Sequence, residues 1–383
     1  MQSWIDNKVV ERVRQHLLNH NLDINARNVV HALEKQGYIY TAKTVLKLVE
    51  QIEAEFSGLG PLKPLLAITG VTDIFVNGHA EVWIDKGQKL ERYPLHFGSE
   101  ERLREIAIRL VNSTGRRLDD SQPAVDARLP NGIRIHAVLP PLSPNKTLLS
   151  LRIPQQQSLN FENLITSESI NELLADVLYR IVKQKKNFLI SGATGSGKTA
   201  LLCALLELTN TNERLLIVED SSELFPSHPH VVHLEAQQKN IEGSGEIVLQ
   251  DLVKHALRMR PDRLIVGECR GAEVKDLLHA FNTGHSGGCG TIHANSTKDL
   301  PARLEALCAL AGLEREAAWA QINSALDLAI HVANENGNRF VSEITLVNSK
   351  PSGEIIMLPA LNYDGHETRK LSGYQQLTEL LAK

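Results

Sequence analysis

The stretch LISGATGSGKTALL, residues 189–202, sets three glycines between two apolar runs. Its central part, GATGSGKT, fits the pattern G-x-x-x-x-G-K-[ST] with one extra glycine at Gly195, and such a turn directs its backbone N–H groups at a phosphate. The apolar run before the turn predicts a buried strand, and the run after it predicts a buried helix whose N-terminus also attracts an anion. The stretch therefore predicts a phosphate-binding loop for a nucleotide.

The pattern also predicts what the side chains of this loop do. Lys198 is expected to reach the β- and γ-phosphates of ATP, and the hydroxyl of Thr199 is expected to bind Mg²⁺. The alternative is a glycine-rich turn followed by an ordinary surface lysine, which the flanking strand and helix patterns disfavour. The residues predicted to bind the nucleotide are Gly192, Ala193, Thr194, Gly195, Ser196, Gly197, Lys198, Thr199 and Ala200.

The composition of the chain is that of a globular protein with room for two or three domains. Of its 383 residues, 42% are hydrophobic and 22% are charged, and the formal net charge is -4. This acidic balance and the 4% of aromatic residues argue against nucleic acid as a partner. The sequence has no membrane-spanning run, no segment of signal-peptide type, and four widely spaced cysteines that argue against a zinc site or a disulfide framework. These features predict a cytoplasmic protein.

The first half of the chain predicts a helical segment followed by a mixed domain. Residues 1–56 place apolar side chains at helical spacing. Residues 57–153 combine short strands with one amphipathic helix, and VDARLPNGIRIHAVL predicts a hairpin with its turn at Asn131 and Gly132. The polar stretch PQQQSLNFEN, residues 154–163, begins with proline and predicts a linker to the second half.

Residues 164–383 alternate predicted strands with predicted helices. The strands are 187–191, 214–219, 230–235, 263–267 and 288–293, and the helices are 169–184, 198–208, 248–259 and 272–283, with further helices to about residue 333. Alternation of this kind predicts an α/β domain with a parallel-rich sheet and helices on its faces.

Two of these predicted strands lead into acidic residues. RLLIVEDSSEL contains Glu219, Asp220 and Glu223 after its apolar run, and RLIVGECRG contains Glu268. Because the carboxyl ends of parallel strands meet at the edge where the phosphate loop lies, one acid can hold Mg²⁺ through water and another can orient or deprotonate the attacking water. The alternative is that these acids are solvated turn residues. Two of them, each after an all-apolar strand and both downstream of the loop, favour the catalytic interpretation.

A third stretch, NTGHSGGCGTIHANS, places His285 and His293 on either side of a glycine-rich turn and a predicted strand. Metal binding is one interpretation, but no cysteine or carboxylate follows at ligand spacing. We therefore interpret the two histidines as sensors of the γ-phosphate or of a neighbouring subunit.

These motifs, in this order, resemble those of a known family. GATGSGKT, IVEDSSEL, LIVGECRG and GHSGGCGTIHANS are similar to the phosphate loop, Asp box, Walker B and His box of the type II/type IV secretion ATPases. GLGPLKPLL, VTDIFVNG, GRRLDDSQPAVDARLPNGIRIHAVLPPL and LLSLRIP are similar to the N-terminal domain of the Tad (tight adherence) pilus branch. The resemblance spans residues 56–335, and the ends of the chain carry no motif of the family.

The resemblance implies a RecA-like ATPase domain preceded by a smaller α+β domain of PAS-like type. It implies a homohexamer in the cytoplasm, peripheral to the inner face of the cell membrane and docked on an inner-membrane platform protein. ATP hydrolysis, with ATP and Mg²⁺ as cofactors, would then power pilus assembly or protein secretion. The family's C-x-x-C zinc module is missing from this sequence, which moves the chain toward the Tad and conjugation-like branches.

The resemblance also implies roles for single residues. Glu219 matches the catalytic glutamate of the Asp box, and Glu268 matches the Walker B acid, expected to hold Mg²⁺ through water. Both the Glu219 and the Glu268 carboxylate remain candidates for activating the attacking water. Arg134 and Arg152 match arginines that the family brings to the γ-phosphate. Further candidates, for contacts across a subunit interface, are Arg258, Arg260 and Arg270.

Two other functions compete with a secretion motor. One is a RecA-like motor on nucleic acid, such as a helicase or a conjugation-associated ATPase. The other is a nucleotide-responsive scaffold with little turnover, although the lysine, threonine and two glutamates expected of an active enzyme are all present.

Overall fold

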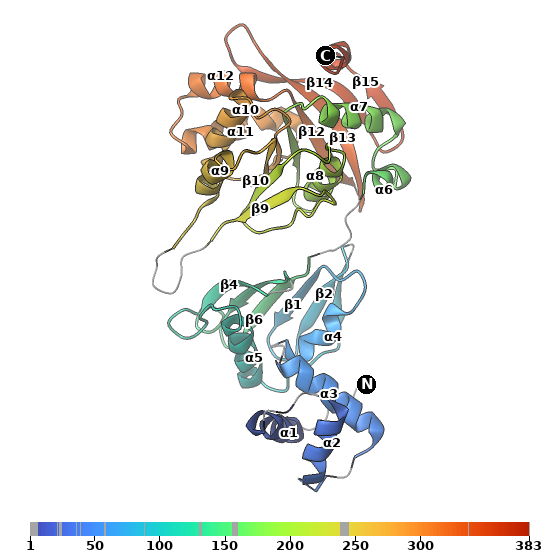
Figure 1. Ribbon diagram of the computed structural model, residues 1–383, viewed down its shortest axis with the longest axis vertical. Coiled ribbons are helices and arrows are strands. Elements are labelled where there is room, and N and C mark those ends of the chain that lie inside the picture. Colours follow the sequence, from blue (N-terminus) through green and yellow to red (C-terminus); the bar gives the residue numbers. More distant parts are fainter. Residues whose placement is uncertain are drawn as a thin grey trace. The chain divides into compact units, whose positions relative to one another are not determined.

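The chain folds into two compact units, Met1–Gln155 and Gln156–Lys383, in a computed structural model (Figure 1). The structure describes residues 7–382 apart from 21, 23, 24, 36, 39, 57, 58, 88, 130, 131, 155–159, 238–244 and 336. No helix within the described residues is long and apolar enough to cross a membrane.

The first unit begins with three helices, where the sequence predicts a helical segment. They are α1 (Asn7–Asn19), α2 (Ala26–Lys35) and α3 (Ala42–Phe56). Val13, Val29 and Ile52, one from each helix, are completely buried in a small core of their own. The helices therefore stabilise one another through apolar stripes at helical spacing.

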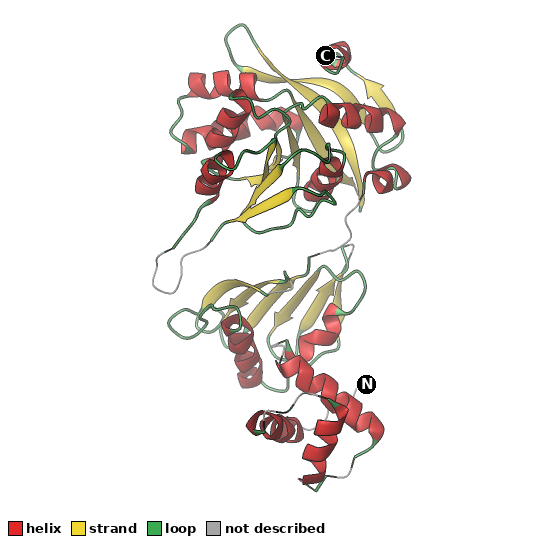
Figure 2. Ribbon diagram, in the orientation of Figure 1, coloured by secondary structure: helices red, strands yellow, loops and turns green. Residues whose placement is uncertain are grey.

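An antiparallel sheet forms the rest of the first unit (Figure 2). Its strand order is β3-β2-β1-β6-β5-β4. The strands are β1 (Asp73–Asn77), β2 (Val82–Asp85), β3 (Leu90–Tyr93), β4 (Ala124–Arg128), β5 (Arg134–Val138) and β6 (Leu148–Arg152). The short helices η1 (Gly60–Leu62) and α4 (Lys63–Leu66) and the longer α5 (Glu100–Asn112) pack on one face, over a core that includes Ile74, Ile106 and Leu151. The predicted hairpin is β4–β5, and Asn131 of its predicted turn lies outside the described residues.

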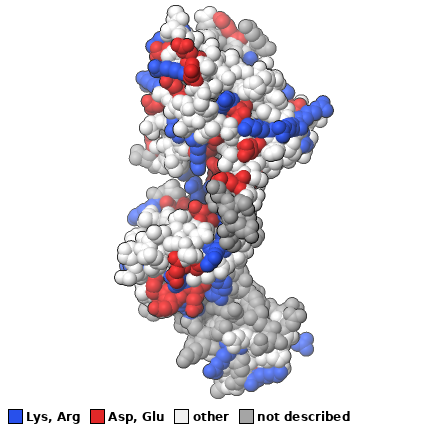
Figure 3. Space-filling model, turned by 90° about the vertical axis from the view of Figure 1, so that its left-hand side faces the viewer, with Lys and Arg blue, Asp and Glu red and all other residues white. Residues whose placement is uncertain are grey.

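The molecule's surface carries charges of both signs. Figure 3 shows Lys and Arg interspersed with Asp and Glu on the visible face of each unit. The helix α5 illustrates the local logic, because Glu100 and Glu101 lie in its first turn and Arg109 in its last, where the helix dipole favours each charge.

The second unit is an α/β layer structure built on a nine-stranded sheet of order β15-β14-β13-β12-β7-β11-β10-β8-β9. The strands are β7 (Phe188–Gly192), β8 (Leu215–Glu219), β9 (Val231–Glu235), β10 (Arg263–Cys269), β11 (Cys289–His293), β12 (Leu328–Glu335), β13 (Asn338–Ser349), β14 (Ile355–Tyr363) and β15 (Thr368–Lys370). The run from β12 to β9 is parallel throughout, and β13 to β15 extend it in antiparallel pairing. The predicted parallel-rich sheet is confirmed.

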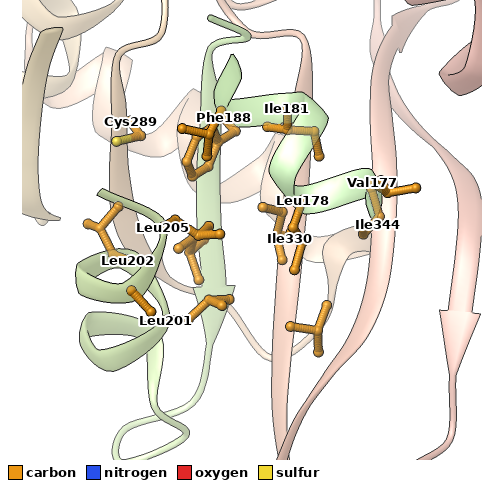
Figure 4. Packing of buried hydrophobic residues seen from close by; sticks show 14 of the residues in the cluster. Val177, Leu178, Ile181, Phe188, Leu201, Leu202, Leu205, Cys289, Ile330 and Ile344 are labelled. Atoms are coloured by element: carbon orange, nitrogen blue, oxygen red, sulfur yellow. The ribbon is translucent and has the colours of Figure 1, made fainter. Parts of the chain in front are cut away.

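Helices cover both faces of this sheet. On one face lie α6 (Phe161–Thr166), α7 (Glu172–Lys183), α8 (Lys198–Glu207) and α13 (Tyr374–Leu380); on the other lie α9 (Leu249–Leu257), α10 (Glu273–Asn282), α11 (Leu300–Leu310), which follows η2 (Thr297–Asp299), and α12 (Arg315–Ala325). Figure 4 shows Phe188 and Ile330, on neighbouring strands, packed with Ile181 of α7 and Leu205 of α8. Burial on both faces explains why these strands read as continuous apolar runs.

The structure corrects two boundaries predicted from the sequence. Residues 328–333, which we expected in a helix, belong to the strand β12, because a short run of buried apolar residues does not distinguish a strand from a helix. The predicted linker ends earlier than residue 163. Phe161 already begins α6, since the side chain of Asn160 caps that helix by accepting a hydrogen bond from the backbone N–H of Asn163 at 2.8 Å.

Candidate functional site

The phosphate loop connects β7 to α8, as the sequence predicts. Gly195 and Gly197 have φ values of +73° and +102°, a backbone conformation that would be strained in a residue with a side chain. A Cβ at Gly192 would lie 2.5 Å from both the Ser196 hydroxyl and the carbonyl oxygen of Val332, so the loop is built for a glycine there as well. The buried Ser196 Oγ has no hydrogen-bond partner among the described residues, which leaves a polar atom available to an anion. The loop therefore fits a phosphate group.

Lys198 begins α8 and folds back into the turn. Its Nζ donates hydrogen bonds to the carbonyl oxygens of Gly192 (3.1 Å) and Ala193 (2.8 Å), and it lies 3.3 Å from His293 Nδ1. The side chain is almost fully buried, and this burial lowers the pKa of its ammonium group. Burial deprives the ammonium group of the water that would stabilise its charge. A bound phosphate would stabilise this charge instead, through its negative oxygens.

His293 links Lys198 to the acid on β10. Since His293 is the register partner of Gly192, its imidazole lies beside the loop, and its Nε2 is 2.7 Å from Glu268 Oε1. This close contact lacks hydrogen-bond geometry, so Oε1 has no hydrogen-bond partner among the described residues. The other oxygen, Oε2, accepts a hydrogen bond from Arg270 at 2.5 Å. Burial, followed by the charge of Lys198, lowers the pKa of His293, which favours the neutral ring.

Glu219, at the end of β8, is buried and supports the turn that follows it. Its Oε1 accepts hydrogen bonds from the backbone N–H groups of Glu223 (2.9 Å) and Leu224 (3.2 Å). Its Cγ occupies the space that a Cβ at Gly267 would need, at 2.5 Å. The carboxylate therefore holds the turn from inside the sheet edge, where water has little access.

Glu223, the second glutamate of the same stretch, is exposed on that turn. Burial lowers the pKa of Lys198, and the charge of Glu223 weakly opposes this shift. The hydrogen bond to Glu268 raises the pKa of Arg270, and the charge of Glu223 adds a smaller part. Glu223 therefore lies at the site, with a carboxylate that solvent can reach. The resemblance of IVEDSSEL to the Asp box implies a catalytic role for Glu219, and the spacing of the two acids does not say which of them turns inward.

The structure does not bring His285 into this cluster. His285 precedes the amino end of β11, whereas the phosphate loop follows the carboxyl end of the parallel neighbour β7. Its Nδ1 lies 3.2 Å from the carbonyl oxygen of Ala280, at the end of α10. Only His293 of the predicted pair lies next to Lys198.

The five candidate arginines fall in different places. Arg270 lies in the cluster, beside Glu268 and 3.9 Å from Asp220. Arg258 and Arg260 follow α9, on the loop before β10. In the first unit, the two arginines assigned to the γ-phosphate are register partners at the ends of β5 and β6, which brings Arg134 and Arg152 side by side on one face of that sheet.

A cleft of about 450 Å³ opens beside the phosphate loop. Its lining consists of Gly192, Ala193, Thr194, His293, Ala294, Asn295, Asp299 and Arg303. Arg303, an exposed residue of α11, is not among the site residues predicted from the sequence. The sequence feature that could have pointed to Arg303 is its position shortly after the His box. The cleft adds a cation and a carboxylate to the side of the loop that His293 faces.

Comparisons with known proteins identify the family of the chain. Residues 55–350 match the family model described as Type II/IV secretion system protein. A Mycobacterium tuberculosis protein provisionally named a conjugal transfer protein is 44% identical over 310 residues, which cover 79% of this chain and 88% of that protein. The type IV secretion system protein VirB11 of Brucella suis is 29% identical over 321 residues, covering 75% of this chain and 88% of VirB11.

A solved structure shares the fold of the chain. The crystal structure of the pilus retraction motor PilT with bound ADP matches with a TM-score of 0.51 and 18% identity, covering 82% of this chain and 85% of PilT. The two chains therefore share a fold. Since the family model covers well over half of the sequence, the chain belongs to the type II/IV secretion system protein family and is an ATP hydrolase of that family.

Proposed function

We propose that this ATPase works as a homohexameric ring at the inner face of the cell membrane. There it would dock on an inner-membrane platform protein and drive assembly of a Tad-type pilus or secretion of a protein. The observation that carries the proposal is a pair of close side-chain contacts at the carboxyl edge of the sheet. Lys198 Nζ lies next to His293 Nδ1, and His293 Nε2 lies next to Glu268 Oε1. The motifs of residues 115–132 support the Tad branch, with a PAS-like first domain and a RecA-like second domain.

The residues of the site divide the work of phosphoryl transfer among them. Residues 192–200 would hold the phosphates through backbone N–H groups and Lys198. Thr199, in the first turn of α8, and Glu268, through water, would hold Mg²⁺, which neutralises charge on the phosphate oxygens when it is bound. The neutral ring of His293, between Lys198 and Glu268, would sense the γ-phosphate.

Activation of the attacking water falls to the turn after β8. The resemblance assigns the catalytic role to Glu219. Its carboxylate accepts a hydrogen bond from the backbone N–H of Glu223, which favours a role in positioning that residue. Glu223 presents an exposed carboxylate near Lys198, so it would orient and deprotonate the water.

Three glutamine substitutions separate these roles. Glu223→Gln should lower kcat by about 100-fold while the affinities for ATP and Mg²⁺ stay within about twofold, since only the basic oxygen is lost.

Glu268→Gln should raise the Mg²⁺ concentration needed for half-maximal activity. Glu219→Gln should lower kcat by less than about tenfold and reduce the free energy of unfolding by about 1 kcal/mol, because a neutral amide still accepts both backbone hydrogen bonds. Steady-state kinetics with Mg²⁺ titrations measures all three.

Asp251→Asn is a matched control, since Asp251 is an exposed acid on α9 that pairs with Lys254. If Glu219→Gln stalls hydrolysis while Glu223→Gln turns over normally, the base is Glu219 and the division proposed here is wrong. Equal Mg²⁺ titrations for Glu223→Gln and Glu268→Gln would contradict the role of Glu268.

A conjugation-associated ATPase, or another motor on nucleic acid, is the second candidate. The name of the mycobacterial relative favours it. The net charge of -4 and the interspersed charges of Figure 3 disfavour direct binding of nucleic acid. Stimulation of ATP hydrolysis by single-stranded DNA would favour this candidate. The affinity for the DNA should then fall on the order of a thousandfold between about 50 and 200 mM salt, and the stimulation should fall with it.

The proposed function is tested in cells whose only copy of the chain carries Lys198→Ala. These cells should lose surface pili or the secreted protein, while the chain remains in the membrane fraction through its platform. Removal of residues 1–56 in a second strain tests whether the N-terminal helices make the platform contact. Loss of DNA transfer with pili intact would overturn the Tad assignment and leave the conjugation-associated function.

A further inference from the structure

The hairpin formed by β12 and β13 contacts the nucleotide site at several points far away in sequence. Ser191 Oγ, just before the phosphate loop, lies 2.9 Å from His331 Nδ1 on β12. Thr297, at the end of the His-box segment, donates a hydrogen bond to Glu343 on β13. His331 and Glu343 are themselves register partners. The hairpin is therefore attached to the segments on both sides of the cleft, and residues of its turn end reach the loop itself.

Arg339, the second residue of β13, makes the contact with the loop. Its side chain is exposed, yet its Nε donates a hydrogen bond of 3.0 Å to the carbonyl oxygen of Gly195. Its Cδ lies 3.4 Å from the position that a Cβ at Gly197 would take, so the Arg339 side chain passes beside the open face of that glycine. Arg339 therefore runs along the outside of the turn from Gly195 to Gly197.

This contact holds one particular peptide unit of the loop. The Gly195 carbonyl and the Ser196 N–H belong to the same planar group, so they point in opposite directions. The carbonyl accepts from Arg339, and the N–H donates to the carbonyl oxygen of Ala193 at 3.3 Å. With both ends held, the unit cannot rotate freely, although glycines on either side would otherwise allow it.

We propose that Arg339 is a positioning residue for ATP, which holds the Gly195–Ser196 peptide in the orientation that phosphate binding needs. A glycine-rich turn loses much backbone entropy when it closes on a ligand, and a contact that orders it beforehand increases affinity. Arg339 contacts the backbone of the loop and leaves the acids near the attacking water untouched. Its effect therefore falls on nucleotide affinity, equally for ATP and ADP, and leaves the chemical step alone.

The test compares nucleotide affinity with turnover in the full-length chain. Arg339→Ala should raise the KM for ATP and the Kd for ADP by about fivefold each, the loss expected for one partly solvated hydrogen bond to a charged donor, with kcat within about twofold. Arg339→Lys should restore both to within about twofold of the parent, because an ammonium group can donate to the same carbonyl. The unfolding temperature without nucleotide should stay within a few degrees of the parent in both variants.

Arg369→Ala is the matched control, because Arg369 is an exposed arginine of the same antiparallel extension that pairs with Asp364. An unchanged Kd for ADP in Arg339→Ala, a fall in kcat at constant KM, or a lysine variant as weak as the alanine variant would overturn the proposal. The inference rests on the assignment of the loop to nucleotide. If the parent chain does not bind ADP, the assignment of the loop is wrong. If the parent and Arg339→Ala bind ADP equally tightly, only the proposed role of Arg339 is wrong.

Discussion

Lys198→Ala is expected to lower ATP turnover by at least about 100-fold, the loss typical of removing a group that stabilises developing charge, while the chain still folds. The ammonium group lies inside the phosphate turn, hydrogen-bonded to the carbonyl oxygens of Gly192 and Ala193. Arg303, at the mouth of the cleft, cannot replace it, because an exposed cation on α11 does not share the turn. Fold retention is expected because burial already disfavours the charged lysine, as its lowered pKa indicates.

The measurement is a phosphate-release assay beside a thermal unfolding curve. Lys254→Ala serves as the control, since Lys254 is a half-exposed lysine that pairs with Asp251 on α9. ATP hydrolysis by Lys198→Ala at close to the parental rate would contradict the assignment of the loop. Loss of activity together with loss of the cooperative unfolding transition would show instead that Lys198 supports the fold.

The parts of the site that depend on local sequence could be predicted. The phosphate loop is one, because glycines at positive φ between an apolar strand and an apolar helix leave little choice of conformation. The positions of Glu268 and His293 are others, since Glu268 is the penultimate residue of one buried strand and His293 ends another. Their meeting at Lys198 then follows from parallel pairing, which brings the carboxyl ends of the strands to one edge.

The parts that depend on strand order could not be predicted. Arg339 reaches Gly195 from 144 positions away, because β12 pairs with β7 and carries β13 along with it. The sequence stretch behind that hairpin reads as a continuation of helices, since LAIHV is apolar without a diagnostic period. The difference in burial between Glu219 and Glu223, on which the proposed role of Glu223 rests, has the same origin. The space that Gly267 leaves on the neighbouring strand decides which acid turns inward.

Arg134→Ala or Arg152→Ala should lower kcat by about 100-fold while the Kd for ADP stays within about twofold, if these arginines stabilise charge on the γ-phosphate in the transition state. They are register partners, and Arg128 continues the same cross-strand row beyond Arg134, while Asp73 lies beyond Arg152. The positive charges of the arginines in this row would attract an anion such as the γ-phosphate. A guanidinium stays charged at all physiological pH values and offers two parallel donors to phosphate oxygens.

We propose domain motion on the same basis: arginines that touch the γ-phosphate would distinguish ATP from ADP, and a ligand shifts a conformational equilibrium only through such a difference. Arg104→Ala is the matched control: Arg104 lies on α5 in the same unit and pairs with Asp120 at 2.7 Å. Single-turnover hydrolysis and ADP titration separate the two effects. An equal loss of ADP affinity in Arg134→Ala would mean that the row binds nucleotide uniformly and cannot drive closure. Hydrolysis at the parental rate by both arginine variants would mean that residues 156–383 contain the whole catalytic machinery, and that the first unit acts on the partner of the motor alone.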